Sequence, residues 1–302
     1  MKVLGGVEGG GTKFVCAIGS GETRELIDRR EFATSAHPDD TIGEILEYFD
    51  AHRQDLSAIG IACFGPVELN PDSPRYGYIT STPKPGWRDV DIVGPVSRAF
   101  PGLPIGFDTD VNGAALAEMR WGAAQNAGSF VYLTVGTGIG GGGMVQGRPI
   151  FGLLHPEMGH MFIPHDWARD PFAGACPFHG DCLHGLASGP AIETRWGRKA
   201  ETLPDSHEAW RLEAHYLALG LANIVYVLSP ERIILGGGVV KQPSLLPMVR
   251  SEIAGYMRGS LEAPELREPG IDAYVVRSAL GDDAGVLGAL ALARRSLHRR
   301  PH

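Results

Sequence analysis

The sequence has few cysteines, no excess of basic residues and no long hydrophobic run. Four cysteines in 302 residues are too few for a disulfide framework and suit a reducing cytoplasm. Asp and Glu number 35 against 27 Lys and Arg, for a net charge of -8, so the basic surface that binds nucleic acid is missing. No segment approaches the roughly 18 consecutive apolar residues of a membrane span, and the start does not resemble a signal peptide. We therefore expect a cytoplasmic protein without nucleic-acid or membrane partners.

Glycine, in contrast, is abundant and clustered. The chain has 42 glycines, and many of them lie within residues 5–11, 136–143 and 236–238. Such clusters need a local cause, for example a backbone that passes close to a ligand. The hydrophobic content of 43% is ordinary for a globular protein, and the length allows two lobes with their own cores.

The first glycine cluster lies between two predicted strands, residues 3–7 and 14–18. Its residues are Glu8, Gly9, Gly10, Gly11, Thr12 and Lys13. The backbone N–H groups of such a turn can approach an anion because no Cβ blocks the way, and Thr12 and Lys13 add a hydroxyl and a positive charge. The pattern is neither a P-loop nor a dinucleotide-binding fingerprint. Taken alone, it is also compatible with a plain hairpin.

The second cluster repeats this arrangement after a predicted strand at residues 129–135. The glycine run contains Gly136, Thr137, Gly138 and Gly140, and Met144 and Val145 follow it. Two strand–glycine–strand units predict a duplicated lobe and argue against a plain hairpin in both places. Two anion-binding turns that face each other would suit a nucleoside triphosphate between the lobes. The third cluster, Gly236, Gly237 and Gly238, follows a strand at residues 232–235 and predicts close approach to a base or ribose.

Asp110 lies where a predicted strand at residues 104–107 gives way to a helix at residues 114–121. This is the position at which α/β sheets place their ligands. Asp110 is therefore a candidate general base that accepts a proton from a substrate hydroxyl. The alternative is that Asp110 or Asn112 only caps the helix, and this segment alone favours the cap.

Amphipathic or apolar patterns predict further helices at residues 41–53, 209–228 and 286–297. A long loop at residues 70–87 ends in T-P-K-P-G-W. We expect this loop to be ordered, because long loops in compact proteins are more often functional than idle.

Four side chains near the middle of the chain form a candidate zinc site. Cys176, His179 and Cys182 recur at steps of three, and His160 lies sixteen residues before Cys176. Zinc prefers four sulfur or nitrogen ligands in a tetrahedron, and four protein ligands leave no open position for catalysis. We therefore expect a structural zinc site. The tight spacing argues against scattered, unrelated Cys and His residues.

Together, these motifs resemble those of the ROK sugar kinases, in family order and over essentially the full length. The run from Glu8 to Lys13 resembles the first phosphate loop, and residues 133–142 resemble the second. Asp110-x-Asn112 is similar to the catalytic motif, Glu157-x-x-His160 with C-P-F-H-G-D-C to the sugar-and-zinc segment, and residues 235–238 to the adenosine motif. Glu8, the zinc segment and the T-P-K-P-G-W loop are similar to the zinc-containing bacterial fructokinases.

The resemblance implies an α/β, two-lobed fold of the actin, hexokinase and Hsp70 ATPase class, with ATP and sugar in the cleft between the lobes. It implies transfer of the γ-phosphoryl group of ATP to the 6-hydroxyl of a hexose, with fructose favoured, and Mg²⁺ on the phosphates. Asp110 would accept the hydroxyl proton. The implied sugar-binding residues are Asn112, Glu157, His160 and His184. The implied lobes are residues 1–112 with 284–302, and residues 113–283, and the implied assembly is a homodimer.

His184 departs from the family pattern, which has Glu two residues after the last zinc Cys. A neutral imidazole can still hydrogen-bond but carries no fixed negative charge, so the preferred hexose stays open among fructose, glucose, mannose and N-acetylated hexosamines. A non-catalytic sugar sensor is a second interpretation, because the family includes transcriptional repressors. The early first loop and the net charge of -8 argue against a DNA-binding segment.

Overall fold

The computed structural model describes residues 2–298, which form two compact units. The first unit takes its described residues from Met1–Gln125, Pro149–His155 and Asp282–His302, and the second consists of Asn126–Arg148 and Pro156–Gly281. Residues 1 and 299–302 of the predicted small lobe lie outside the described residues. The helix that begins at Asp110 belongs to the first unit, whereas the predicted lobe boundary at residue 112 divides it. The functional lobe boundaries stay a prediction.

The first unit is built on a five-stranded sheet with the order β3-β2-β1-β4-β7. Its strands are β1 (Val3–Gly9), β2 (Lys13–Gly19), β3 (Leu26–Ala33), β4 (Leu56–Cys63) and β7 (Ile105–Thr109). Strands β1, β2 and β3 pair antiparallel, whereas β1, β4 and β7 run parallel. A two-stranded ribbon, β5 (Tyr78–Ile79) and β6 (Val90–Asp91), lies within and just after the long loop.

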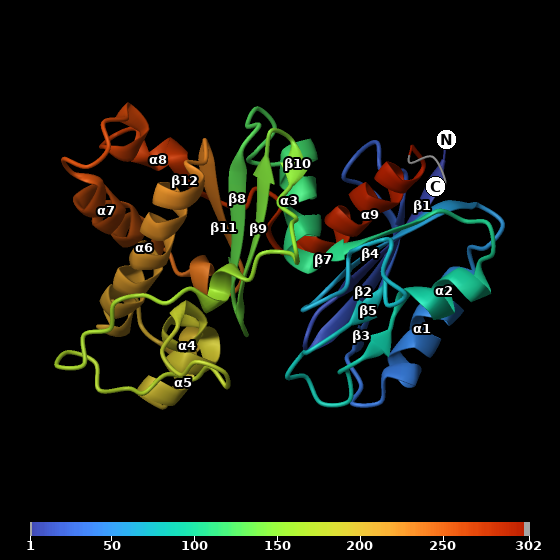
Figure 1. Ribbon diagram of the computed structural model, residues 1–302, viewed down its shortest axis with the longest axis horizontal. Coiled ribbons are helices and arrows are strands. Elements are labelled where there is room, and N and C mark those ends of the chain that lie inside the picture. Colours follow the sequence, from blue (N-terminus) through green and yellow to red (C-terminus); the bar gives the residue numbers. More distant parts are fainter. Residues whose placement is uncertain (1, 299–302) are drawn as a thin grey trace. The chain divides into compact units, whose positions relative to one another are not determined.

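Helices cover both faces of this sheet because the side chains of β2 alternate. Phe14, Cys16 and Ile18 pack into the core with Phe49 of α1 (Pro38–Asp50) and with α2 (Val93–Ala99). Val15 and Ala17 instead pack with Val286 of α9 (Ala284–Ser296). In Figure 1, α1 and α9 flank the strands of this unit. The amphipathic helix predicted at residues 41–53 is confirmed as α1, with Ile42, Ile45 and Phe49 buried and Leu46 half-buried.

Small residues allow α9 to approach β4 and α3 (Asp110–Trp121) closely. A Cβ on Gly60 would lie 1.9 Å from the carbonyl oxygen of Ala289, and one on Gly288 would lie 2.2 Å from the backbone of Gly113. Any larger side chain at either position would push the helix away. The helix that carries Asp110 is thus held against the sheet by backbone contact with α9.

The second unit repeats the strand order of the first. Its sheet has the order β10-β9-β8-β11-β12. The strands are β8 (Phe130–Val135), β9 (Ile139–Val145), β10 (Arg148–Pro149), β11 (Arg232–Gly236) and β12 (Val275–Arg277). Strands β8 and β9 form an antiparallel hairpin, and β8, β11 and β12 run parallel, as β1, β4 and β7 do. The predicted duplication is confirmed by this repeated topology.

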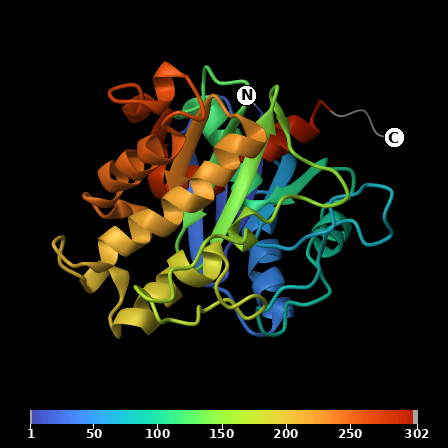
Figure 2. The same ribbon diagram turned by 60° about the vertical axis from the view of Figure 1, so that its left-hand side comes forward.

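The helices of the second unit are α4 (Leu183–Ala187), α5 (Gly189–Trp196), α6 (Ala209–Leu228), α7 (Leu245–Met257) and α8 (Ile271–Tyr274). Single 3-10 turns are η1 (Met158–His160), η2 (Ala200–Thr202), η3 (Val239–Lys241), η4 (Pro264–Leu266) and η5 (Gly281–Asp283). Figures 1 and 2 show the long α6 beside α7, with which it packs. Within residues 2–298, no helix combines the length and apolar character that crossing a bilayer would require. The four cysteines form no disulfide.

Candidate active site and metal centre

The parallel strands of the first unit bring two predicted site segments to one sheet edge. Gly9 at the end of β1 pairs with Cys63 at the end of β4, and Cys63 pairs with Thr109 at the end of β7. The first glycine loop leaves β1 at this edge, and Asp110 follows β7 there. The carboxyl edge of parallel strands is where α/β folds place ligands, so the register supports a common site for both segments.

Asp110 occupies the first position of α3, but the cap of that helix is Thr109. The Thr109 hydroxyl accepts a hydrogen bond from the backbone N–H of Asn112 at 3.1 Å. The Asp110 Oδ1 atom accepts one from the N–H of Val111 at 2.9 Å. Because Thr109 supplies the cap, the alternative that Asp110 or Asn112 serves as the cap is wrong. Helix capping therefore does not account for a carboxylate at position 110.

Asp110 and Glu8 share a desolvated environment that raises the pKa of both carboxyls. Burial raises the pKa of Asp110 to about 6, against a hydrogen bond from Val111 that lowers it. Burial and, secondly, the negative charge of Asp110 raise the pKa of Glu8 to about 7. Two neighbouring carboxylates with raised pKa values in one site are typical of proton-transfer chemistry near neutrality.

Asn112 lies deeper than a ligand-binding side chain usually does. It is 2% exposed, and its Nδ2 donates to Asp108 Oδ1 at 2.7 Å. Asp108 also accepts from the N–H of Thr109 at 2.8 Å, so this pair braces the turn before α3. The Oδ1 atom of Asn112 has no hydrogen-bond partner among the described residues. Its predicted role in sugar binding stays a prediction.

Replacing Glu8 by Gln should make the chain more stable above neutrality. Folding raises the pKa of the Glu8 carboxyl from 4.5 to about 7, so its protonated form stabilises the folded state. This contribution to the free energy of unfolding is complete below pH 4.5 and is lost as the pH rises through 7. We expect the advantage of the E8Q variant in the free energy of unfolding to grow by about 2 kcal/mol from pH 5 to pH 8. Urea denaturation at the two pH values measures it.

The exposed Glu31 of β3 provides the matched control, since a hydrogen bond from Lys13 lowers the pKa of its carboxyl. E31Q should therefore gain no stability with rising pH. An E8Q advantage that is the same at pH 5 and pH 8 would contradict the raised pKa of Glu8.

The second and third glycine turns lie next to each other in the second unit. They follow the neighbouring parallel strands β8 and β11, and a Cβ on Gly136 would lie 3.9 Å from the backbone nitrogen of Gly238. Gly237 has φ of +91°, and a Cβ there would lie 2.3 Å from the Val135 carbonyl oxygen, so only glycine fits. The first of these turns is Gly136–Thr137–Gly138, whereas Gly140 lies within β9. The predicted nucleotide contacts of these residues stay predictions.

The four predicted metal ligands come together in the second unit. One ligand atom from each of His160, Cys176, His179 and Cys182 lies within 4.8 Å of the others. The Nδ1 atom of His160 is 3.6 Å from the sulfur of Cys176 and 3.7 Å from that of Cys182. Zinc bonds of about 2.3 Å to sulfur and about 2.0 Å to nitrogen place tetrahedral ligand atoms roughly 3.5 Å apart. The residues therefore fit one tetrahedral zinc ion.

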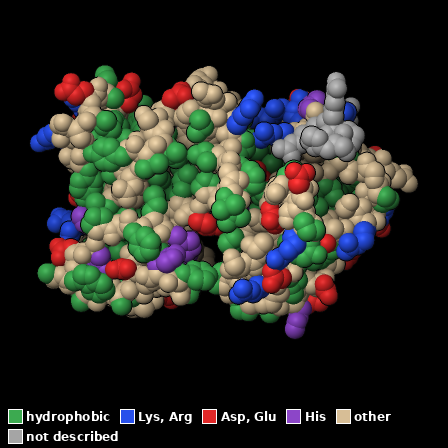
Figure 3. Space-filling model, viewed as in Figure 1, with side chains coloured by type: hydrophobic (Ala, Val, Ile, Leu, Met, Phe, Trp, Pro, Cys, Tyr) green, Lys and Arg blue, Asp and Glu red, His purple; other side chains and the backbone are tan. Residues whose placement is uncertain are grey.

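The local backbone conformation brings the Cys and His side chains of the metal cluster together. Cys176 and Gly180 exchange two backbone hydrogen bonds of 3.0 and 3.1 Å, which close a tight turn around His179. Cys182 follows as the last residue before α4 and is fully buried. Burial raises the pKa of the Cys182 thiol to about 11 and so disfavours the thiolate. A bound cation would offset this free-energy cost by stabilising the thiolate. Histidine side chains gather beside hydrophobic ones over the region of α4 in Figure 3.

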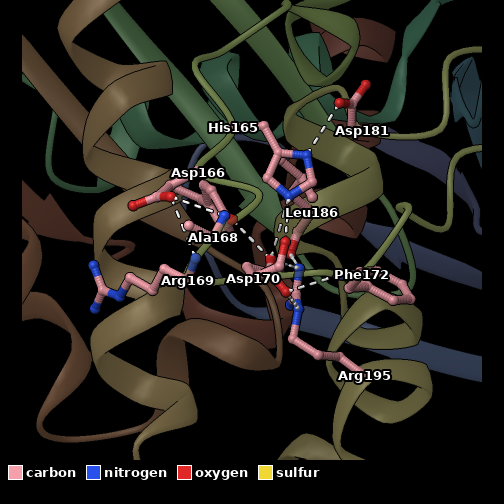
Figure 4. A network of polar contacts seen from close by, with 10 residues as sticks. His165, Asp166, Ala168, Arg169, Asp170, Phe172, Asp181, Leu186 and Arg195 are labelled. Carbon is pink, nitrogen blue, oxygen red and sulfur yellow. Dashed lines mark hydrogen bonds and ion pairs between the residues drawn. The ribbon is translucent and has the colours of Figure 1, made fainter.

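A buried polar network holds the polypeptide around this cluster. Asp170, which is 2% exposed, accepts hydrogen bonds from Arg195 Nε at 3.1 Å and from the Tyr216 hydroxyl at 2.7 Å. One ring nitrogen of His165 contacts the Asp170 carbonyl at 3.0 Å, and the other contacts Asp181 at 3.1 Å. Figure 4 shows His165 between these two partners. Since Asp181 directly precedes Cys182, the network fixes the metal loop to α5 and α6.

This network could not be predicted from the sequence, because its hydrogen bonds join residues as many as 46 positions apart. Asp170, Arg195 and Tyr216 form no short motif that would have indicated it. The cap of α3 could have been predicted, because Thr109 directly precedes the helix and Thr is a common cap at that position.

His184 and Glu157 lie on either side of the metal ligands in sequence. The Nδ1 atom of His184 accepts a hydrogen bond from the N–H of Ile139 at 3.2 Å, and its ring stacks on that of His160 at 5.5 Å. This contact joins the metal segment to the start of β9, next to the second glycine turn. Glu157 is exposed, and its carbonyl accepts from the N–H of His160 at 3.0 Å. Their sugar contacts stay predictions.

The sequence and the structure are both similar to those of known sugar kinases. The sequence is 43% identical over 299 residues to a fructokinase of Zymomonas mobilis, covering 97% of this chain and 96% of that protein. It is 41% identical over 295 residues to a fructokinase of Pediococcus pentosaceus, covering 98% and 99%. The structure resembles that of a ROK family glucokinase from Streptomyces griseus in complex with glucose and AMPPNP, with a TM-score of 0.77, 24% identity and coverage of 97% and 99%.

The structural likeness confirms the predicted fold, the α/β class shared by actin, hexokinase and the Hsp70 ATPase. The sequence matches the ROK family over residues 4–296, and the chain belongs to that family.

Proposed function

We propose that this chain is an ATP-dependent fructokinase that phosphorylates the 6-hydroxyl of fructose. The observation that carries this proposal is identity of 43% and 41% to two fructokinases over nearly the whole chain. The desolvated Asp110 carboxylate and the Cys/His cluster agree with it.

In this reaction, Asp110 orients the acceptor hydroxyl and takes its proton as the oxygen attacks the γ-phosphorus. A carboxylate with a pKa of about 6 is ionised at neutral pH yet is a stronger base than an ordinary Asp. It can therefore accept the proton late, as bond formation to phosphorus lowers the pKa of the hydroxyl. Because phosphoryl transfer requires little covalent participation from the protein, positioning and charge neutralisation account for most of the catalysis.

The glycine turns and the metal residues have separate proposed tasks. The loop that contains Gly9, Gly10 and Gly11 binds the phosphates of ATP, and the turn at Gly136 contacts the same phosphates. The turn at Gly237 lies against the adenosine. When bound, Mg²⁺ neutralises charge on the phosphate oxygens. Zinc, when bound by the Cys/His cluster, fixes the orientation of the His160 ring. The sugar ligands are proposed to be Asn112, Glu157, His160 and His184.

Other hexoses remain alternative substrates, since His184 replaces a carboxylate that would otherwise accept hydrogen bonds from sugar hydroxyls. Its Nδ1 atom is taken by the Ile139 N–H, so only the Nε2 side of the neutral ring is available, and there it donates. This change at one contact favours a shift among hexoses over a loss of activity. A homodimer and a cytoplasmic location complete the proposal, with no nucleic-acid or membrane partner.

A coupled ADP-release assay across fructose, glucose, mannose and N-acetylmannosamine tests the proposal directly. We expect fructose to have the highest kcat/KM, because the compared fructokinases share 43% and 41% identity with this chain. The matched control is the same assay without hexose, which measures ATP hydrolysis. A higher kcat/KM for glucose or mannose would redirect the proposal to another hexose, and the absence of hexose-dependent ADP release would favour the sugar sensor.

A further inference from the structure

The long loop of the first unit is anchored by a buried tryptophan. Trp87 is fully buried, its ring stacks on Phe14 of β2 at 5.4 Å, and its Nε1 donates to the Ser35 carbonyl at 2.8 Å. Gly86, with φ of +81°, lets the chain turn against Ala36, whose carbonyl oxygen would lie 2.0 Å from a Cβ. The preceding residues of the loop are thereby held in a fixed position beside β2. The ordered loop that the sequence predicts is confirmed.

This anchored loop places Lys84 on the first glycine loop. Its ammonium group donates a hydrogen bond to the backbone carbonyl of Gly11. The neighbouring carbonyls are also held, since Thr34 donates from its hydroxyl to Gly10 at 2.8 Å and from its N–H to Thr12 at 3.0 Å. Three successive carbonyls of the loop are therefore turned toward donors of the protein.

The opposite polar groups of the same peptides remain available. Among residues 2–298, no acceptor is found for the N–H groups of Gly11 and Thr12, and no atom lies within 4 Å of a Cβ built on Gly11. The Gly11 carbonyl and the Thr12 N–H belong to one peptide group, so a cation on the carbonyl polarises the N–H and strengthens it as a donor. An ammonium has three donors, and this contact uses one.

Lys13, the cation within the glycine loop itself, has another partner. Its ammonium lies 2.8 Å from Glu31 Oε2 on β3, a carboxylate that Arg29 also contacts at 3.6 Å, so Lys13 is directed toward β3. Lys84 contacts no carboxylate among the described residues and donates only to the neutral Gly11 carbonyl. We propose that Lys84, rather than Lys13, supplies the positive charge that the first glycine loop offers to the polyphosphate of ATP. This inference rests on the proposed kinase function.

Binding of nucleotides with different numbers of phosphates separates a charge contact from a structural role. Calorimetry with AMPPNP, ADP and AMP is carried out on the wild type and on K84M, K13M and R88M. Arg88 is the matched control, because it is an exposed cation directly after this loop and its one ion pair among residues 2–298 is with Asp89. For K84M we expect a loss of roughly tenfold for AMPPNP, the effect of one charge-assisted contact. The loss should be smaller for ADP and absent for AMP, and K84R should restore most of the affinity.

Three results of these binding measurements would contradict the proposed role of Lys84. An equal loss for all three nucleotides in K84M would show that Lys84 only maintains the loop, and a phosphate-dependent loss in K13M alone would return the role to Lys13. Unchanged nucleotide affinity in K84M also overturns it. Wild-type protein that binds no AMPPNP and phosphorylates no hexose would instead remove the proposed function, and with it this assignment.

Discussion

Replacing Asp110 by Asn is expected to lower kcat for hexose phosphorylation by roughly a thousandfold, within the range for loss of a general base. Asn has the same shape and can still accept the hydrogen bond from the Val111 N–H, but it cannot accept the hydroxyl proton. Hexose and nucleotide affinities should stay within about threefold of the wild type, because the binding groups are retained. Steady-state kinetics combined with calorimetry of AMPPNP and fructose measures both quantities.

The same variant should fold at least as stably as the wild type. Burial of the Asp110 carboxylate raises its pKa, which means that its ionised form costs folding free energy at pH 8. D110N removes that cost, so an inactive variant with an unchanged or higher free energy of unfolding is the expected combination. D283N, which changes an exposed carboxylate paired with Arg29 at 2.8 Å, should keep its activity. A D110N variant with wild-type kcat would show that Asp110 is not the base.

The pH dependence provides a second readout for Asp110. Only the carboxylate form accepts a proton, so kcat/KM should rise through pH 6 and level off above pH 7. The neighbouring Glu8 has a pKa of about 7, raised by burial and by the charge of Asp110, so it stays largely protonated while Asp110 ionises. E8Q should therefore leave the rise near pH 6, because burial raises the pKa of Asp110, whereas a profile that is flat from pH 5 to pH 8 would exclude a carboxylate of raised pKa as the base.

Much of the fold and site could be predicted because their signals are local in sequence. Cys176, His179 and Cys182 lie within seven residues, so their spacing alone brings these three ligands together, and the strand–glycine–strand units form local hairpins. Strand β3 was not predicted, since it is an edge strand with exposed charged residues. Helix α7 was also missed; Pro247 and Gly255 lie inside it, and both residues weaken a helical pattern.

The interactions between distant segments required the structure. Glu8 and Asp110 are 102 residues apart, and only the parallel register of β1, β4 and β7 brings their strand ends together. The pairing of Lys13 with Glu31 depends on the unpredicted β3. From the sequence, Lys13 therefore looked like the cation of the glycine loop, and Lys84, more than 70 residues away, did not. Electrostatic roles follow from tertiary neighbours, which local patterns do not contain.

Removing zinc, or replacing Cys176 by Ala, is expected to reduce stability and hexose affinity together. Without the ion, two buried thiols and two imidazoles crowd within 4.8 Å with no shared cation, and the segment loses its main cross-link. A loss of a few kcal/mol would lower the Tm by about 5–10 °C. Because His160 belongs to both the cluster and the proposed sugar site, its ring should lose its fixed orientation and weaken fructose binding. Calorimetry and thermal unfolding, each with and without chelator, measure the two effects.

The response to chelator distinguishes a structural zinc from the alternatives. Wild-type protein should release one zinc per chain and lose stability, whereas C176A should have a low Tm that chelator does not change. C16A is the matched control, since Cys16 is also buried but belongs to the core of the first unit; it should respond to chelator as the wild type does. Loss of turnover with unchanged stability and fructose affinity would instead indicate a catalytic metal. The contacts of Asp170 with Arg195 and Tyr216 involve no metal ligand, so we expect α5 and α6 to stay folded below the lowered Tm and the far-ultraviolet circular dichroism of the whole protein to persist.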